Sequence, residues 1–117
     1  MAKKIHIKRI YENAAPDDGY RILIDRVWPR GMTKEKAKLD EWNKDIAPST
    51  ALRKWFNHEE ERFAVFKKKY SKELAGQSAT IQRLKKIAAK ENLCLLYGAK
   101  NEQYNQAVVL KEILMAG

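Results

Sequence analysis

The stretch "YRILIDRVWPRG", from Tyr20 to Gly31, decides the fold that the sequence predicts. Its first part, Tyr20–Val27, is rich in apolar and β-branched residues, which is typical of a buried strand. The strand end is unusual, because arginine, tryptophan and proline stand where small polar turn residues are the norm. We therefore predict a central strand whose exit carries a site.

Two further segments are predicted to be strands. Lys4–Ile10 alternates apolar and polar residues, as an edge strand with one buried face does. Leu93–Tyr97, "LCLLY", is a continuous apolar run, which indicates a strand buried on both faces, as in parallel sheets. The link between the first two strands is short for a parallel crossover, so the direction of the first strand stays open.

Helices are predicted between the second and third strands and again after the third, from apolar residues at helical spacing. The expected helices start at Thr33 (with Leu39, Trp42 and Ile46 inward), span Thr50–Phe56 (capped by Ser49), Glu59–Ala75 (capped by Asn57 or His58) and Ala79–Lys90, and follow Gly98. Strands joined through helices predict an α/β protein. We expect a small single-domain layered fold over residues 1–117, with a short, at least partly parallel sheet flanked by helices.

Composition limits the classes of partner. The net charge of +9 favours anionic partners, nucleic acid included, but each third of the chain is net positive and no basic tail stands out. No apolar run is long enough for a signal peptide or a membrane span, and the single cysteine, Cys94, fits a reducing compartment. We expect a cytoplasmic protein. His6 and His58 are too far apart in sequence to suggest a metal site, and no cofactor motif occurs.

The predicted site lies where the parallel strands end, because open α/β sheets bind ligands beyond the carboxyl ends of their strands. The residues expected to line this site are Asp25, Arg26, Trp28, Pro29, Arg30 and Gly31 after the second strand, and Tyr97 and Asn105 after the third. Helix starts at Thr33 and near Asn101 would add free backbone N–H groups. Guanidinium groups and an indole predict a ligand that is negatively charged and partly planar.

A purely structural role for the same residues stays open. Asp25 and Arg26 could form an internal ion pair, Trp28 could pack on neighbouring residues, and Arg30 could stack on a tryptophan. A secondary anion site is predicted at Ser49, Thr50 and Arg53, where helix capping is the simpler explanation. Cys94, flanked by leucines, is expected to be an inert thiol.

Two sequence blocks, "IDRVWPRG" (24–31) and "APSTALRKWF" (47–56), closely resemble the YeaO-like branch of the domain-of-unknown-function family numbered 488. The resemblance extends from about residue 5 to residue 114 and implies a compact cytoplasmic α/β protein without an established activity. Longer relatives look as if they carry a cysteine and a Cys-His-Arg triplet where this chain has Tyr97 and Asn105–Ala107. Tyr104 stands where the branch often has histidine. Thiol or histidine chemistry is therefore not carried over.

Three functions remain in view. The first is binding of a small phosphate- or carboxylate-bearing, nucleotide-like molecule, with Arg26 and Arg30 neutralising charge, Trp28 stacking, and Tyr97 and Asn105 orienting the ligand. The second is nucleic-acid binding with Trp28 as a stacking platform. The third is a protein-interaction module without a small ligand, in which the exposed tryptophan and arginines of the strand exit are hot spots for another chain. The sequence leaves open whether the protein is an enzyme, which oligomer it forms and whether the Trp28–Pro29 bond is cis.

Overall fold

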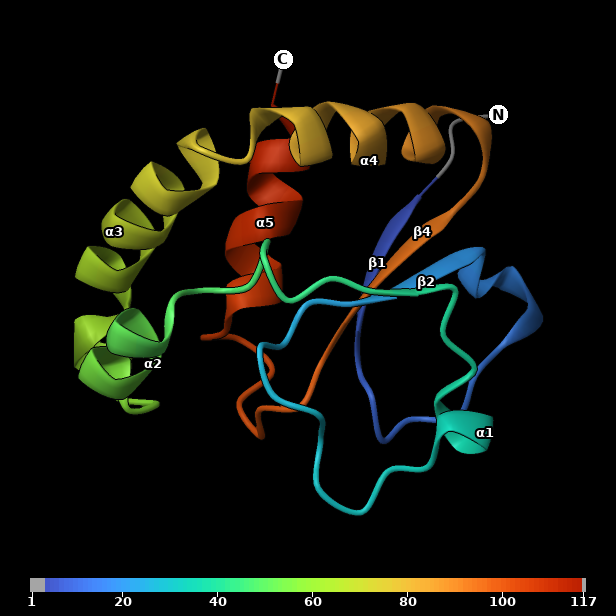
Figure 1. The fold of residues 1–117 in the computed structure, drawn as a ribbon, viewed down its shortest axis with the longest axis horizontal. Coiled ribbons are helices and arrows are strands. Elements are labelled where there is room, and N and C mark those ends of the chain that lie inside the picture. Colours follow the sequence, from blue (N-terminus) through green and yellow to red (C-terminus); the bar gives the residue numbers. More distant parts are fainter. Residues whose placement is uncertain (1–3, 117) are drawn as a thin grey trace.

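The computed structural model describes residues 4–116 as an α/β protein with four strands in one sheet (Figure 1). The elements are β1 (Ile5–Arg9), η1 (Pro16–Asp18), β2 (Tyr20–Leu23), α1 (Lys34–Ala37), β3 (Glu41–Trp42), α2 (Thr50–Phe56), η2 (Glu60–Arg62), α3 (Phe63–Ala75), α4 (Ser78–Lys90), β4 (Leu93–Tyr97) and α5 (Gln106–Met115). The strand order is β1-β4-β2-β3, and every neighbouring pair is parallel. The predicted fold class is confirmed, and the open question about the first strand is answered: β1 is parallel to β4.

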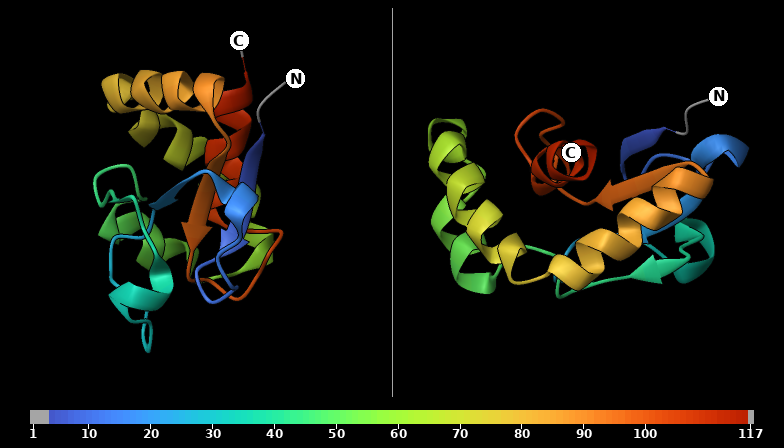
Figure 2. Two further views of the ribbon diagram at one scale, coloured as in Figure 1. Left: turned by 90° about the vertical axis from the view of Figure 1, so that its right-hand side faces the viewer. Right: turned by 90° about the horizontal axis from the view of Figure 1, so that it is seen from above.

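The strand β4 lies in the interior of the sheet, which explains its continuous apolar sequence. Leu93, Leu95 and Tyr97 belong to one core cluster, and Cys94 and Leu96 to the other, so both faces of β4 are buried. All four long helical segments, α2 to α5, contribute to the first cluster. The second cluster is covered by α1 and the chain around it, with Trp28, Met32, Leu39 and Trp42 packed at its margin. The sheet therefore has helices on one face and a thinner layer on the other (Figure 2).

The predicted helix from Thr33 through Ile46 is wrong beyond its first turn. Thr33 caps α1 as expected, but Lys38 adopts a left-handed backbone (φ 46°) that ends the helix. The chain then runs along the edge of β2, where the Asp40 N–H donates to the Arg21 carbonyl and Trp42 pairs with Leu23. Sheet pairing with β2 outweighs the helical spacing of the apolar residues.

Several predicted boundaries also shift. Strand β2 ends at Leu23 rather than Val27, since the chain leaves the sheet once Ile24 has donated its N–H to the Leu96 carbonyl. The predicted cap at Asn57 or His58 is wrong, because Asn57 instead terminates α2. The last helix starts at Gln106, not near Asn101, whose side chain binds the N–H groups of the turn before α5. The helices at α2, α3 and α4 are confirmed within a few residues.

Candidate functional site

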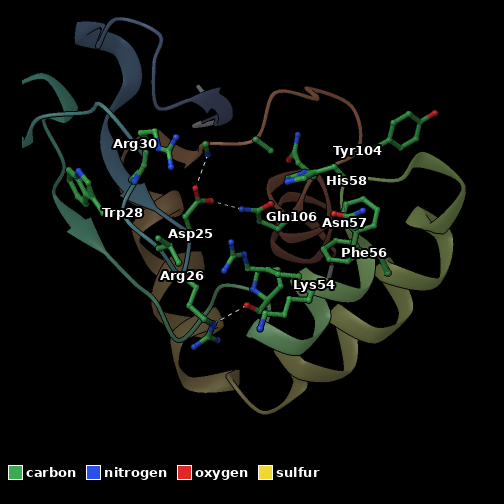
Figure 3. Close-up of a pocket in the computed structure, with 18 of the residues that line it drawn as sticks. Asp25, Arg26, Trp28, Arg30, Lys54, Phe56, Asn57, His58, Tyr104 and Gln106 are labelled. Atoms are coloured by element: carbon green, nitrogen blue, oxygen red, sulfur yellow. Dashed lines mark hydrogen bonds between the residues drawn. The ribbon is translucent and has the colours of Figure 1, made fainter.

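A pocket of about 520 Å³ opens beyond the carboxyl ends of β2 and β4. Three segments form most of it: residues 25–30 after β2, the C-terminal end of α2 through His58, and residues 98–106 from the end of β4 to the start of α5. Tyr11, Pro48 and Phe66 complete the lining. We call it the strand-exit pocket. Figure 3 shows Asp25 near its centre, with Gln106 beside it and the end of α2 across from it. Its volume lies within the range of roughly 300–1,000 Å³ that is usual for small-molecule sites.

Asp25 is held by neutral donors. The Gly98 N–H donates to its Oδ2 at 2.8 Å, and the Gln106 side-chain amide donates to its Oδ1. Glycine at position 98 allows this contact, because a Cβ would stand 2.8 Å from Asp25 Oδ2 and would displace the carboxylate. Burial raises the pKa of Asp25 from 3.8 to about 6, against the Gly98 N–H, the positive charge of Arg53 and the Gln106 amide. Asp25 therefore titrates close to physiological pH.

Arg26 joins the pocket wall to the turn before α2. Its Nε donates to the Pro48 carbonyl at 3.0 Å and its Nη2 to the Ala47 carbonyl at 3.1 Å. Two of its donor groups are thus occupied by backbone carbonyls, and the ion pair between Arg26 and Asp25 that the sequence left open as a structural alternative does not form. Arg26 positions the end of the pocket nearest α2.

The Trp28 side chain is engaged by a hydrogen bond and by packing within its own loop and against Trp42. Its indole N–H donates to the Met32 carbonyl at 2.8 Å, and its ring meets the Trp42 ring edge-on at 5.2 Å between centroids. Trp42 in turn donates its indole N–H to the Asp25 carbonyl at 2.7 Å. The two tryptophans therefore fix the loop that follows β2, which is the packing alternative raised for Trp28 from the sequence.

Pro29 and Gly31 shape the same loop. Pro29 is buried against Gly98, and its bond to Trp28 is trans. Gly31 has φ +78° with open space around it, so it permits a tight turn rather than a close approach, and it lies outside the pocket lining. The close approach expected at Gly31 occurs instead at Gly98.

Three cations that line the pocket have no hydrogen-bond or ion-pair partner in the described part of the chain, although the charge of Arg53 acts on Asp25. Among residues 4–116, no carboxylate or carbonyl pairs with the side chains of Arg30, Arg53 or Lys54. His58 also lines the pocket, with a left-handed backbone (φ 56°) directly after the left-handed Asn57. Two consecutive non-glycine residues in this region are uncommon, and such strain gathers at functional sites. The pocket thus carries an excess of positive charge around one acid, Asp25.

Tyr97 and Asn105 lie deeper than expected. Tyr97 is 2% exposed, belongs to the core, and is absent from the pocket lining; burial raises its pKa. Asn105 lines the pocket but is 1% exposed, because it caps α5 by accepting from the Val108 N–H and donates to the Asn101 carbonyl. Tyr97 lies behind the pocket wall and Asn105 forms part of that wall, whereas Gln106 is the residue whose side chain reaches Asp25.

The predicted secondary anion site already holds a carboxylate of the chain. Ser49 donates its N–H to Glu73 Oε1 at 2.8 Å and its hydroxyl to Glu73 Oε2 at 2.6 Å, while capping the Leu52 N–H. Thr50 is exposed beside it. Arg53, one turn further along α2, faces the strand-exit pocket instead. The three residues are therefore divided between two places.

Sequence reasoning missed the residues that α2 and the segment before α5 supply. Lys54, Asn57, His58, Tyr104 and Gln106 line the pocket. The position of α2 across from β2 brings Lys54, Asn57 and His58 there, and the start of α5 brings Tyr104 and Gln106. No local pattern indicates either position. Asn57 alone gave a signal, since asparagine tolerates the left-handed backbone that ends a helix.

The described residues show no metal-binding cluster and no membrane-spanning helix. In residues 4–116, no three His, Cys, Asp or Glu side chains gather in a way that could hold a metal ion. Over the same residues, none of the helices has the length and apolar character needed to cross a membrane. Burial raises the pKa of the Cys94 thiol to about 12, so the thiol stays protonated and unreactive at neutral pH.

Comparison with known proteins gives a consistent result. Residues 4–117 match the family model described as the inactive DUF488-N3 subclade. The chain is 50% identical over 110 residues to the uncharacterized protein YeaO of Escherichia coli K12, covering 94% of this chain and 96% of that protein. It is 36% identical over 111 residues to the uncharacterized protein Rv3073c of Mycobacterium tuberculosis H37Rv, covering 95% and 93%. No solved structure matches the chain significantly.

Proposed function

The chain belongs to the DUF488 family, in its inactive N3 subclade, and on that premise we propose that it binds a small phosphate- or carboxylate-bearing molecule in the strand-exit pocket. The observation that carries the proposal is the set of three unpaired cations, Arg30, Arg53 and Lys54, around one cavity. A positive charge left unpaired at the wall of a cavity favours an anion there, because charged hydrogen bonds are the stronger ones.

Binding without chemistry is the form of the proposal that fits best. The description of the subclade as inactive supports it, and so does the burial of Tyr97, because a tyrosine behind the pocket wall is poorly placed to donate a proton to a ligand. Phe56 and Tyr104 line the cavity beside the cations, which suits a ligand with a flat or apolar part as well as its acid group. The single buried Cys94 fits the cytoplasm, where we propose that the protein acts.

The two other functions weighed from the sequence lose their main support. Both relied on an available Trp28, as a stacking platform or as an interface residue. Its ring packs against Trp42 and its N–H is bound to Met32, so stacking would have to disrupt the loop that fixes Asp25.

The proposal is tested by thermal shift with inorganic phosphate, sugar phosphates, mononucleotides and dicarboxylates at two salt concentrations. A ligand at a hundred times its dissociation constant adds about 2.7 kcal/mol to the free energy of unfolding, which is a shift of several degrees. The wild type is compared with Arg53→Gln and Arg30→Gln. Each change is expected to weaken binding by about 1.5–3 kcal/mol, the contribution of a charged hydrogen bond.

Lys86→Gln is the matched control, because Lys86 is exposed on α4 and does not line the pocket. The substitution removes one positive charge, as Arg53→Gln and Arg30→Gln do. A shift that persists in Lys86→Gln and disappears in Arg53→Gln supports the proposal. Equal losses in both variants would show that only net charge matters, and a panel without any shift would refute the proposal.

A further inference from the structure

A second group of side chains outside the strand-exit pocket combines positive charge with an exposed ring. Trp55 on α2 is 36% exposed, and two cations lie over its ring: the Arg62 guanidinium at 5.5 Å and the Lys69 ammonium at 4.7 Å from the centroid. Val65, 45% exposed, lies between Arg62 and Lys69 on the same face of α3. We call these four residues the Trp55 patch.

Positive charge continues from this patch along α3. Lys68 and Lys72 stand one turn from Val65 and Lys69, on the adjoining surface, and neither has an ion-pair partner among residues 4–116. The nearby acids, Glu59, Glu60 and Glu61, all lie before α3. Glu59 is already paired with Arg62 at 3.0 Å, and Glu60 accepts a hydrogen bond from the Asn101 side-chain amide at 3.2 Å. The cationic surface therefore extends from Trp55 toward the C-terminal end of α3, on the side of the molecule farthest from α1 (Figure 1).

This arrangement differs from the anion pocket in shape and in what it offers. Trp55 is absent from the lining of the strand-exit pocket, and the lysines here follow a helix instead of converging on one point. A row of cations beside an exposed ring matches a chain that repeats a negative charge and a flat group. A phosphate near Lys69 would draw its ammonium away from the indole and free that ring face for stacking.

We propose that the Trp55 patch, with Lys68 and Lys72, is a binding surface for single-stranded nucleic acid. A base stacks on Trp55, and the phosphates on its 3′ or 5′ side contact Lys69 and Lys72. This surface is independent of the strand-exit pocket. It also replaces Trp28, the tryptophan that the sequence suggested for stacking, with Trp55, which is 36% exposed.

The test is fluorescence anisotropy with a labelled twelve-nucleotide oligothymidylate at several salt concentrations. Replacing Trp55 by alanine should weaken binding by about 5- to 150-fold, the range for loss of one stacked base. Trp55→Phe, which keeps a ring, should retain most of the affinity. Lys69→Gln should reduce the slope of log affinity against log salt by about 0.7, the value for one phosphate contact on a single strand.

Two variants serve as controls. Lys86→Gln removes a distant lysine, and Arg53→Gln disables the strand-exit pocket; both should bind the oligonucleotide as the wild type does. The proposal is overturned if the oligonucleotide does not bind, or if Trp55→Ala and Lys69→Gln behave as Lys86→Gln does. It is also overturned if loss occurs in Arg53→Gln alone, or if poly-glutamate competes equally in a Trp55-dependent way, which would indicate an acidic protein partner.

Discussion

Two aspartates flank the central strand β2, and the protein shifts their pKa values in opposite directions. Asp18, just before β2, is 3% exposed and bound by the Arg21 guanidinium, the Lys8 ammonium and the Ala15 N–H. Burial would raise the pKa of Asp18, but these donors outweigh burial and lower it. Asp25, just after β2, receives only the neutral Gly98 N–H and Gln106 amide, and burial raises its pKa to about 6.

The difference shows how a structural carboxylate is told from one at a site. In the group of side chains around Asp18, Arg21 also donates to the carbonyls of Ala37 and Lys38, so its guanidinium is engaged within the protein. In the described part of the chain, Asp25 forms no ion pair, and Arg30, Arg53 and Lys54 line the same cavity without an ion-pair partner. A buried charge with matched partners serves the fold, whereas unmatched charges around a cavity are available to a ligand.

The largest effect is expected from removing Arg21 from the group of side chains around Asp18. Arg21→Ala leaves Asp18 buried with part of its charge uncompensated and orphans the Ala37 carbonyl, so the free energy of unfolding should fall by about 3–5 kcal/mol. Urea denaturation measures this loss. Arg83→Ala is the matched control, because its pair with Glu41 is partly exposed and should contribute less than about 1 kcal/mol. Similar losses in both variants would contradict the contrast.

The second-largest expected effect is the pH dependence of the stability that Asp25 contributes. A folded-state pKa near 6 against 3.8 means that native Asp25 holds its proton where the unfolded chain has released it. The contribution of Asp25 to stability therefore falls as pH rises from about 4 to 6, by about 3 kcal/mol, and changes little above that. Asp25→Asn should remove this fall, so its stability relative to the wild type should increase between pH 4 and 6. Denaturation of both proteins across that range measures it, and a constant difference would refute the shift.

The elements and site residues that could be predicted from the sequence are those that local patterns and burial determine. The apolar run of β4 and the amphipathic spacing of α3 and α4 predicted their elements, because burial alone decides them. The strand β3 was missed, since only two residues pair and the free edge of β2 selects them. At the site, Asp25 and Arg30 were predicted from the strand exit. Their partners on α2 were missed, because helix packing rather than any local pattern brings Lys54 and His58 across the cavity.

The roles of individual residues were harder to predict than their positions. Arg26 and Trp28 stand where the sequence placed them, but backbone carbonyls at Ala47, Pro48 and Met32 take up their donors. Ser49 likewise donates its N–H and its hydroxyl to Glu73, which is 24 positions away in the chain. Which donor remains free for a ligand depends on such long-range partners, and these follow from the tertiary structure alone.

The central claim, that a small anion binds beside Asp25, is tested most directly by two backbone amides in one NMR titration. The Gly98 N–H binds Asp25 and the Ala15 N–H binds Asp18, so they report on the two aspartates in the same sample. On addition of inorganic phosphate or a mononucleotide, we predict a saturable shift of the Gly98 resonance while Ala15 stays unchanged. If Gly98 stays unchanged, or if both amides shift together, the strand-exit pocket is not the anion site.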